Sequence, residues 1–354
     1  MQPMSPALID QQMDTLPELY GQELPRLLTQ AKEAVLSQGI RRIYAVGNGD
    51  SYHAALSAAQ AFAQWTSVDY RPMPAYTFFT REMPRMCPQE RETTLVACIS
   101  ASGSSGLAQS ILKETSTRGL AHTLSITGRT GCPMDQCAES VLSAVITEQG
   151  RSPGIRTYAA SLCALLALAA RMGGTENRLD TLAAWIGRSA QGLAQTLDQS
   201  RQVAAQAAQW DWPHAMVLGC DGLLGCAQFV AAKLAEGCGV LGVAQELEEW
   251  CHVESMTYPL QAPMILLAGD RQSRQQAVKV ATVARKTGRP VLSVCAEADP
   301  ALRDVSDACV ILGLEDPGPL EPLYAYIPGA LLARALADKL GRAMFLSDLP
   351  FSLF

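Results

Sequence analysis

The chain has 354 residues, which is long enough for two domains that each bury a hydrophobic core. Hydrophobic residues make up 48% of it and charged residues 18%, a balance typical of a packed globular protein and not of a disordered one. The formal net charge is -6 and no basic run is present, so we expect neither nucleic acid nor an anionic membrane surface as a partner.

The eleven cysteines are scattered along the chain and contain no CxxC pair. This pattern predicts reduced thiols, with no structural zinc and no other metal site. The N-terminal stretch lacks the basic start and apolar core of a signal peptide, and apolar runs such as "ASLCALLALAA" have about half the length that spans a bilayer. We therefore expect a cytoplasmic protein that is not inserted in a membrane.

In chain order, residues 1–38 are expected to form a helical lead-in that is broken at Pro17 and Pro25. Four short apolar runs follow, separated by helical patterns, and predict strands at 42–47, 94–100, 122–127 and 140–146. A second set of such runs predicts strands at 214–219, 264–269, 290–295 and 308–313. Matching members of the two sets lie 168 to 172 positions apart, so the chain is expected to contain one fold twice.

Short, continuously apolar strands that alternate with helices indicate parallel sheets covered on both faces. The predicted fold class is therefore α/β, with two tandem doubly wound parallel-sheet domains. Their expected limits are 39–177 and 211–354, and an amphipathic helical connector is expected over 178–210.

Two loops follow predicted strands of the first domain, where doubly wound sheets bind ligands. They are "GNGDSYHAA" (47–55) and "ISASGSSGLAQSIL" (99–112). Hydroxyl groups and helix N–H groups can hold a phosphate, whereas a carboxylate suits neutral sugar hydroxyls, so the loops point to a phosphorylated polyol. The candidate substrate-binding residues are Gly49, Asp50, Ser51, Ser100, Ser102, Gly103 and Ser105. Helix capping and turn formation are the alternative roles of these serines, and no nucleotide-binding glycine motif is present.

Both loops resemble those of the sugar isomerase (SIS) domain family. The tandem arrangement resembles the isomerase half of glucosamine-6-phosphate synthase and the fructosamine-6-phosphate deglycases. This resemblance implies a flavodoxin-like fold in each domain, and a phosphate held by Ser51, Ser100, Ser102 and Ser105. The chain departs from the family pattern at Asp50, where a threonine is usual, and at Ala101, where a glutamine is common.

The family's catalytic pattern is a helix with Lys-x-x-Glu, followed by a histidine sixteen residues after the glutamate. "AAKLAEG" supplies Lys233 and Glu236, and "LEEWCHVES" supplies Glu249 and His252 as a Glu-x-x-His segment, with the histidine at that separation. The resemblance implies that Glu236 is the catalytic base, that His252 transfers a proton at the ring oxygen or leaving amine, and that Lys233 completes the site. It also implies a homodimer in which the histidine enters the neighbouring subunit's active site. Taken singly, a helical glutamate is more often solvated and a histidine more often structural.

Two further features stay open from the sequence. Glu246 and Glu248 are interpreted as part of an acidic surface run. Arg156 lies at a predicted helix start, and a ligand contact and a salt bridge are equally compatible with that position.

The preferred function is a deglycase that cleaves a 6-phosphorylated sugar–amino acid conjugate without a cofactor. Two departures from the synthase pattern favour it: Val253–Glu254 replaces a Gly-Pro, and the tail "GRAMFLSDLPFSLF" contains no lysine. A phosphosugar aldose–ketose isomerase or an aminosugar-phosphate deaminase is the alternative, because the same base would serve. A non-catalytic phosphosugar sensor is disfavoured, since sensors of this family usually combine one sugar-binding unit with a DNA-binding segment.

Overall fold

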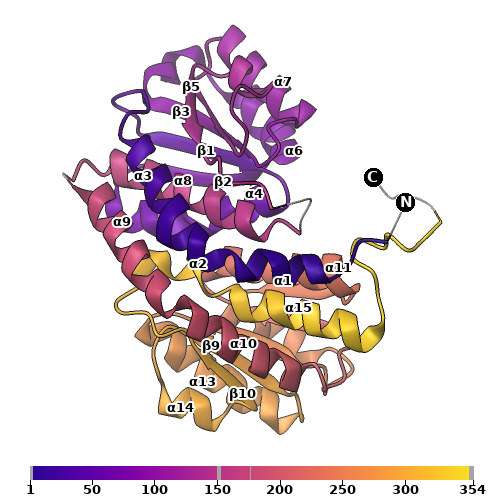
Figure 1. Cartoon of the computed structure of the whole chain (residues 1–354). Helices are drawn as coiled ribbons and strands as arrows, with labels where there is room; N and C mark the ends of the chain where they lie inside the picture. The colour runs from indigo at the N-terminus through magenta and orange to yellow at the C-terminus, as the bar shows by residue number, and fades with distance from the viewer. Residues whose placement is uncertain (1–2, 150–152, 176, 351–354) are drawn as a thin grey trace. The chain divides into compact units, whose positions relative to one another are not determined.

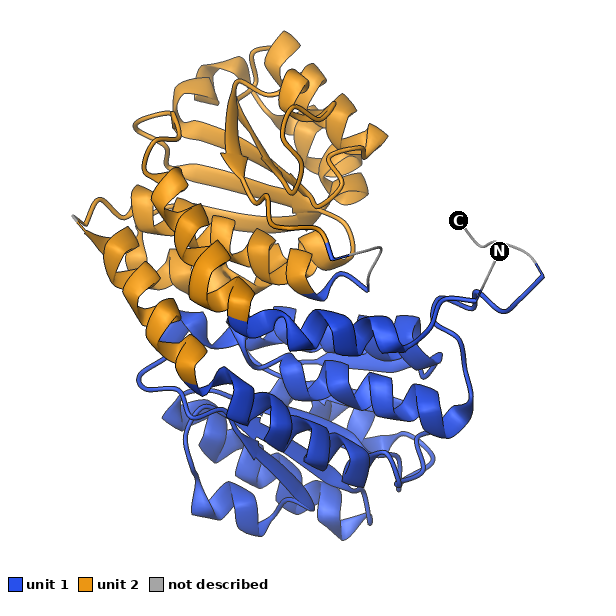
Figure 2. Ribbon diagram, in the orientation of Figure 1, with its two compact units in different colours: residues 1–17, 149–155, 192–354 blue, residues 18–148, 156–191 orange. Residues whose placement is uncertain are grey.

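The computed structural model describes residues 3–149, 153–175 and 177–350. The described residues form two compact units, which Figure 2 shows in different colours. Unit 1 draws on 1–17, 149–155 and 192–354, and unit 2 on 18–148 and 156–191. The predicted lead-in and the predicted connector therefore each contribute residues to both units.

Unit 2 is built on a parallel five-stranded sheet in the order β2-β1-β3-β4-β5 (Figure 1). Its strands are β1 (Arg42–Gly47), β2 (Asp69–Pro74), β3 (Thr94–Ser100), β4 (His122–Thr127) and β5 (Ser140–Ser143). The helical segments that precede β1 are α2 (Leu16–Glu18), the π-helical η1 (Leu19–Glu23) and α3 (Leu24–Ala31). Those between β1 and β3 are α4 (Asp50–Ser57), α5 (Ala59–Trp65), α6 (Ala75–Thr77), η2 (Phe78–Glu82), η3 (Met83–Arg85) and η4 (Pro88–Thr93). The remaining ones are α7 (Gly106–Thr117), η5 (Asp135–Cys137), α8 (Ile155–Met172), α9 (Arg178–Ser189) and η6 (Ala190–Gly192).

Unit 1 contains a second parallel sheet, in the order β10-β9-β8-β6-β7. Its strands are β6 (Ala215–Leu218), β7 (Gly242–Gln245), β8 (Met264–Ala268), β9 (Val291–Cys295) and β10 (Ala308–Ile311). Its helices before β8 are α1 (Ala7–Asp14), α10 (Leu193–Ala207), α11 (Gly222–Cys238), α12 (Leu247–His252) and η7 (Glu254–Met256). Those after β8 are α13 (Arg271–Lys286), α14 (Pro300–Asp304), η8 (Gly318–Leu323) and α15 (Ile327–Leu340).

The two sheets are structural repeats, because their strands pair in the same register. Paired residues of the first and second strand are 27 positions apart in each sheet, as in Ile43 with Tyr70 and Met216 with Val243. The third and fourth strands are also offset by 27 in both sheets, and the fourth and fifth by 16. Only the offset between the first and third strands differs, at 52 and 48. The predicted class, two tandem parallel α/β domains, is confirmed, and each sheet has the 2-1-3-4-5 strand order of flavodoxin-like folds.

Both faces of each sheet are covered, which explains the continuously apolar strands. In unit 2, α4 packs on β1, β2 and β3, while α7 packs on β3 and β4. In unit 1, residues of α12, α13 and α14 share a buried cluster with β8 and β9, and α10 packs on β10. All seven residues of β3 and all five of β8 are buried.

Strands β2 and β7 were not expected from the sequence. Both lie at a sheet edge beside the first strand of their unit. Asp69–Pro74 has no fully buried residue and contains two prolines, while Gly242–Gln245 has only four residues, none fully buried. Edge strands pair on one side only and bury little side-chain area, so they lack the apolar run that identifies a central strand.

The lead-in breaks before Pro17 but not at Pro25. Helix α1 ends at Asp14 and α2 begins at Leu16, whereas the chain continues helically from η1 into α3, with Glu23 and Leu24 both in the helical conformation. The apolar run near residue 165 belongs to a longer element than expected. Helix α8 is the one helix among the described residues that could cross a membrane by length and composition, and 83% of it is buried within the protein.

Candidate functional site

The first candidate loop is a tight turn from β1 into α4. A Cβ on Gly47 would lie 2.9 Å from the backbone of Ser51, and Gly49 has a φ of 51°, which favours glycine. The chain therefore passes from strand to helix in two residues, and α4 begins at Asp50. In a sheet of this order the crevice between the first and third strands is the usual ligand position, so the turn lies where a ligand is expected.

The second candidate loop leaves β3 on the other side of that crevice. The Oγ of Ser100 accepts a hydrogen bond from the Gly103 N–H at 3.2 Å, and Ser105 caps α7 by accepting from the Ala108 N–H at 3.4 Å. The hydroxyls of Ser102 and Ser104 are 2.8 Å apart. The capping and turn roles considered as alternatives are therefore real for Ser100 and Ser105. Accepting such a bond still leaves a hydroxyl proton, which can be donated to an anion.

The loop from β4 to β5 packs against the second candidate loop, which we call the serine loop. The thiol of Cys132, which is buried, lies against Gly103, and a Cβ on Gly128 would lie 2.7 Å from the Ala101 carbonyl oxygen. The Met134 N–H donates to the carbonyl of Gly103 at 3.2 Å. Gly103 has a φ of 63° as well, so its lack of a side chain is required twice. None of these supporting residues was singled out from the sequence, because they follow a different strand.

Asp50 and Asn48 complete the first loop. Asp50 lies in the first turn of α4, where the helix dipole favours a carboxylate, and its Oδ1 is 3.8 Å from the Nδ1 of His53. The Oδ1 of Asn48 accepts from the Ala75 N–H at 3.2 Å and so joins the turn to the end of β2. Asn48 is a positioning residue that the sequence analysis missed, although its place in "GNGDS" marks it as a turn residue.

The two residues of the Lys-x-x-Glu pattern meet on α11. The Nζ of Lys233 lies 2.5 Å from the Oε2 of Glu236, donates to the carbonyl of Pro153 and lies 4.7 Å from the centre of the Phe229 ring. The Lys233 side chain is only 1% exposed, whereas that of Glu236 is 30% exposed. The lysine is thus a fixed internal cation, and the carboxylate beside it reaches solvent. A spacing of three residues on a helix brings both to one face.

His252 is placed differently. It is the last residue of α12, its side chain is 65% exposed, and its Nε2 lies 3.5 Å from the Oε1 of Glu248. Large apolar side chains that follow it are also exposed, namely Val253, Met256 and Tyr258. The serine loops lie in unit 2, while Lys233, Glu236 and His252 lie in unit 1.

Glu248 is exposed and Glu246 half-buried, and the acidic run also has a structural role. The Oε2 of Glu246 accepts from the N–H groups of Glu248 and Glu249 at 2.7 and 2.9 Å and so caps α12. Glu248 faces His252 one turn further along the same helix. The acidic run thus builds the short helix that ends in the candidate histidine.

Arg156 forms a salt bridge and lies away from solvent. It is the second residue of α8, it is 1% exposed, and its Nη2 lies 2.5 Å from the Oε1 of Glu23. The Thr147 N–H donates to the other oxygen of the same carboxylate at 2.5 Å. This geometry decides between the two roles that the sequence left open.

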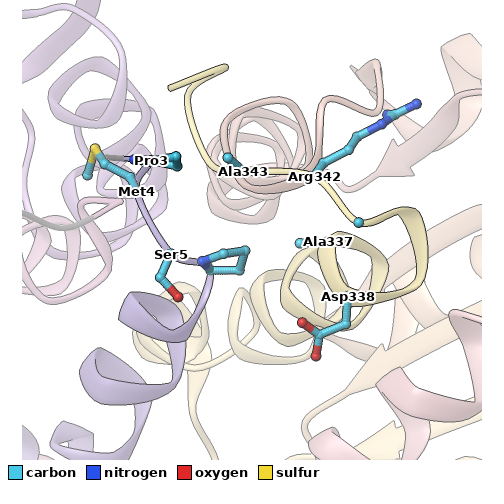
Figure 3. Close-up of a pocket in the computed structure, with 9 residues that line it drawn as sticks. Pro3, Met4, Ser5, Ala337, Asp338, Arg342 and Ala343 are labelled. Atoms are coloured by element: carbon cyan, nitrogen blue, oxygen red, sulfur yellow. The ribbon is translucent and has the colours of Figure 1, made fainter. Parts of the chain in front are cut away.

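One cavity of about 380 Å³ lies in unit 1 between the N-terminal and C-terminal segments (Figure 3). It is lined by Pro3, Met4, Ser5, Pro6, Ala337, Asp338, Gly341, Arg342 and Ala343. In Figure 3 the guanidinium of Arg342 points away from Met4 and Ser5, and its Nη1 donates to the Cys238 carbonyl at the end of α11. The segment that follows contacts α11, because the Phe345 N–H donates to the main-chain oxygen of Glu236 at 2.8 Å. Within the described residues, no group of three or more His, Cys, Asp or Glu side chains could hold a metal ion.

Comparison with known proteins identifies a family for part of the chain. The SIS domain model matches residues 38–171. A comparison with curated protein sequences finds no match.

Similar solved structures cover nearly the whole chain. The C-terminal domain of glucosamine-fructose-6-phosphate aminotransferase from Francisella tularensis has a TM-score of 0.77 at 15% identity, over 94% of this chain and 96% of that one. Tagatose-6-phosphate ketose/aldose isomerase from Escherichia coli has a TM-score of 0.75 at 15% identity, over 98% of each chain. Glucosamine-6-phosphate deaminase from Thermotoga maritima has a TM-score of 0.69 at 17% identity, over 96% and 98%. At these identities the likeness concerns the fold. Residues 38–171 match the SIS domain, and the sheet of the other unit repeats the same strand order.

Proposed function

We propose that this protein is an enzyme that moves a proton between C1 and C2 of a 6-phosphorylated sugar or aminosugar, as a phosphosugar isomerase or an aminosugar-phosphate deaminase. The observation that carries the proposal is the Lys233–Glu236 pair, a solvent-reaching carboxylate held by a buried cation. The structures of an isomerase and a deaminase with the same fold support this class over other uses of a SIS domain.

The phosphate is assigned to the serine loops of unit 2. Ser51, Ser100, Ser102 and Ser105 can each donate a hydroxyl proton, and α4 and α7 both begin there, which adds helix N–H groups. Asp50 would repel a phosphate oxygen at close range but can accept from neutral sugar hydroxyls. The sugar would therefore lie with its phosphate on the serines and its hydroxyls toward Asp50.

Glu236 is assigned the proton transfer. In its ionised form it would take the proton from the carbon beside the carbonyl or iminium group and return it to the neighbouring carbon. Lys233 would orient the carboxylate and hold its charge. His252 would exchange a proton with the ring oxygen or, in a deaminase, with the amine that leaves as water is added.

His252 is assigned to the active site of a second copy of the chain. Its exposed side chain is followed by Val253, Met256 and Tyr258, with exposed fractions of 53%, 67% and 82%. Exposed apolar side chains gathered beside a candidate catalytic residue are typical of an interface. A homodimer would cover them and bring each histidine to the partner's site.

A deglycase that acts on a 6-phosphorylated sugar–amino acid conjugate is the second candidate. Val253 and Glu254 follow His252 where the synthase pattern has Gly-Pro, and residues 343–350 contain no lysine. The lysine that precedes this segment in the sequence, Lys339, donates to the carbonyls of Gln209 and Trp210. These departures favour a reaction that needs no tail lysine to open a sugar ring.

Incubation in D2O with a panel of substrates tests the proposal. The panel contains hexose 6-phosphates, glucosamine 6-phosphate and 6-phosphorylated fructosamine conjugates of amino acids. Deuterium at C2 with ketose–aldose exchange indicates an isomerase, ammonia release a deaminase, and release of a free amino acid a deglycase. Binding of these ligands without any exchange or product would overturn the enzymatic proposal in favour of a sensor.

Mixing two inactive variants tests the shared site. Glu236→Gln and His252→Ala proteins should regain activity when combined, because hybrid dimers contain one intact site. Persistent inactivity after mass spectrometry has shown subunit exchange would place both residues in one chain's site.

A further inference from the structure

The second sheet carries the same strand-end turn as the first. A Cβ on Gly219 would lie 2.5 Å from the Leu223 carbonyl oxygen, as one on Gly47 would approach Ser51. Asp221 has φ and ψ of 47° and -127°, close to the 51° and -130° of Gly49. The backbone of the phosphate turn is thus repeated, with an aspartate in a conformation that normally favours glycine.

The side chains of the phosphate site are not repeated. The common register makes Leu223 the counterpart of Ser51 and Ala268 that of Ser100, and Asp270 caps α13 as Ser105 caps α7. Three hydroxyls are therefore replaced by two apolar groups and a carboxylate. A phosphate would meet no donating hydroxyl at these positions and a repelling charge at one of them.

Glu321, from η8, lies at the corresponding position of unit 1, in a second crevice between the ends of β6 and β8. It is 4% exposed, and its Oε2 lies against the α-carbon of Gly269 at the end of β8, where a Cβ would not fit. Its Oε1 is buried without a hydrogen-bond partner. A side chain of this kind normally stays in water, so its burial at a strand-end crevice calls for a specific role.

The groups that face Glu321 come from every element around it. Arg274 of α13 supplies an opposing positive charge, and its Nη1 donates to the Gly269 carbonyl at 2.6 Å. Asp270 and Glu297 add negative charge, the thiols of Cys226 and Cys295 face the carboxyl, and the Ala296 amide favours its ionised form. Arg274 also forms salt bridges with Glu297, at 3.6 Å from Nη2 to Oε2, and with Asp299, at 3.4 Å from Nε to Oδ2. Its charge is thus divided among several carboxylates.

We infer that the neutral carboxyl of Glu321 is an internal occupant of the second crevice, and that its ionisation releases residues 318–323 from helix α11. A neutral acid can stay beside Gly269 and the apolar Leu223, whereas a carboxylate with an unpartnered buried oxygen must be hydrated. The second repeat is therefore a proton-controlled contact and not a second sugar-phosphate site.

Release of this contact would alter the packing of α11, the helix that carries the Lys233–Glu236 pair. Both η8 and α15 pack on α11. The packing is close, since a Cβ on Gly237 of α11 would lie 3.3 Å from the Cβ of Ala333 on α15. Any effect on catalysis rests on the proposed function, but the contact itself does not.

The pH range follows from the pKa. Burial raises the pKa of Glu321 from 4.5 to about 7, against the opposing effect of Arg274. A folded-state pKa above the unfolded value gives stability that is complete below about pH 4.5 and is lost as the pH rises toward 7. Within that range the folding constant should fall roughly tenfold per pH unit from this group alone.

A direct test is an infrared pH titration of the full-length protein and of Glu321→Gln. We expect the wild-type spectrum to contain a protonated carboxylic acid band at pH 6 that is lost with a midpoint near 7 and is missing in the variant. A wild-type spectrum without such a band at pH 6 would overturn the inference. Neither outcome depends on whether the protein is an enzyme.

Hydrogen exchange tests the release. Peptides covering 318–326 and 222–238 should lose protection in the wild type between pH 6 and pH 8.5 once the intrinsic pH dependence is removed by reference to 94–117 in the other unit. Protection in Glu321→Gln should not change over that range, and the exposed control Glu33→Gln should behave as the wild type. Equal pH dependence in the wild type and Glu321→Gln would overturn the inference.

Discussion

The thiol of Cys132 occupies the space that a side chain on Gly103 would need. The two residues follow different strands, β3 and β4, and their contact fixes the serine loop against the loop beside it. The phosphate-binding geometry proposed for Ser100 and Ser102 therefore depends on a residue that is absent from the loop's own motif.

Replacing Gly103 with alanine should distort this loop. The new methyl group would overlap Cys132, and the φ of 63° is unfavourable for alanine, so we expect a loss of about 1–3 kcal/mol in stability. Phosphosugar affinity by calorimetry should fall at least tenfold. Gly106→Ala is the matched control, because a Cβ there meets nothing within 4 Å. Equal affinities of the two variants would contradict a fixed loop.

The double substitution Ser100→Ala, Ser102→Ala should weaken hexose 6-phosphate binding by a few kcal/mol, because two charge-assisted hydrogen bonds are lost. Calorimetry on the folded variant measures this. Ser110→Ala is the control, since its hydroxyl donates to the Gly106 carbonyl within α7. Unchanged affinity in the double variant would remove the loop from the phosphate site.

Glu236→Gln should keep substrate binding and lose turnover, because the amide retains the shape of the side chain but cannot accept the proton. The expected loss in kcat is about 10²–10⁴-fold, and His252→Ala should lose a similar factor. The combined variant should lose less than the product of the two factors, since both act in one proton-transfer sequence. Glu33→Gln, at an exposed position outside the proposed site, should retain activity. Full kcat in Glu236→Gln would place the base elsewhere.

Arg156→Ala should destabilise unit 2 by about 3–5 kcal/mol, because it removes the buried cation of the Glu23 carboxylate and leaves only the more distant, half-exposed Arg26. Chemical denaturation measures the change. Arg26→Ala is the matched control: its guanidinium is 3.8 Å from the same carboxylate but half exposed, so about 1 kcal/mol or less is expected. Similar losses in both variants would show that burial of the Arg156 pair adds nothing to its strength.

The sequence by itself determined the central strands and the duplication. A strand between two others, covered on both faces, must be apolar throughout, so β3 and β8 could be read directly from their residues. The strand-end turns could also be predicted, because a tight strand-to-helix connection needs glycine at local positions such as Gly47 and Gly49. The Lys233–Glu236 pair follows from helix periodicity in the same way.

Only the tertiary structure decided which polar groups become buried and with which partners. Glu321 reaches Gly269, Arg156 reaches Glu23, and Cys132 reaches Gly103, each through packing of segments distant in sequence. The edge strands β2 and β7 belong with these, since their pairing comes from a neighbouring strand and not from an apolar run of their own. The free energy of a buried charge or an edge pairing depends on the partners that the fold brings to it, and a local sequence pattern holds no information about those partners.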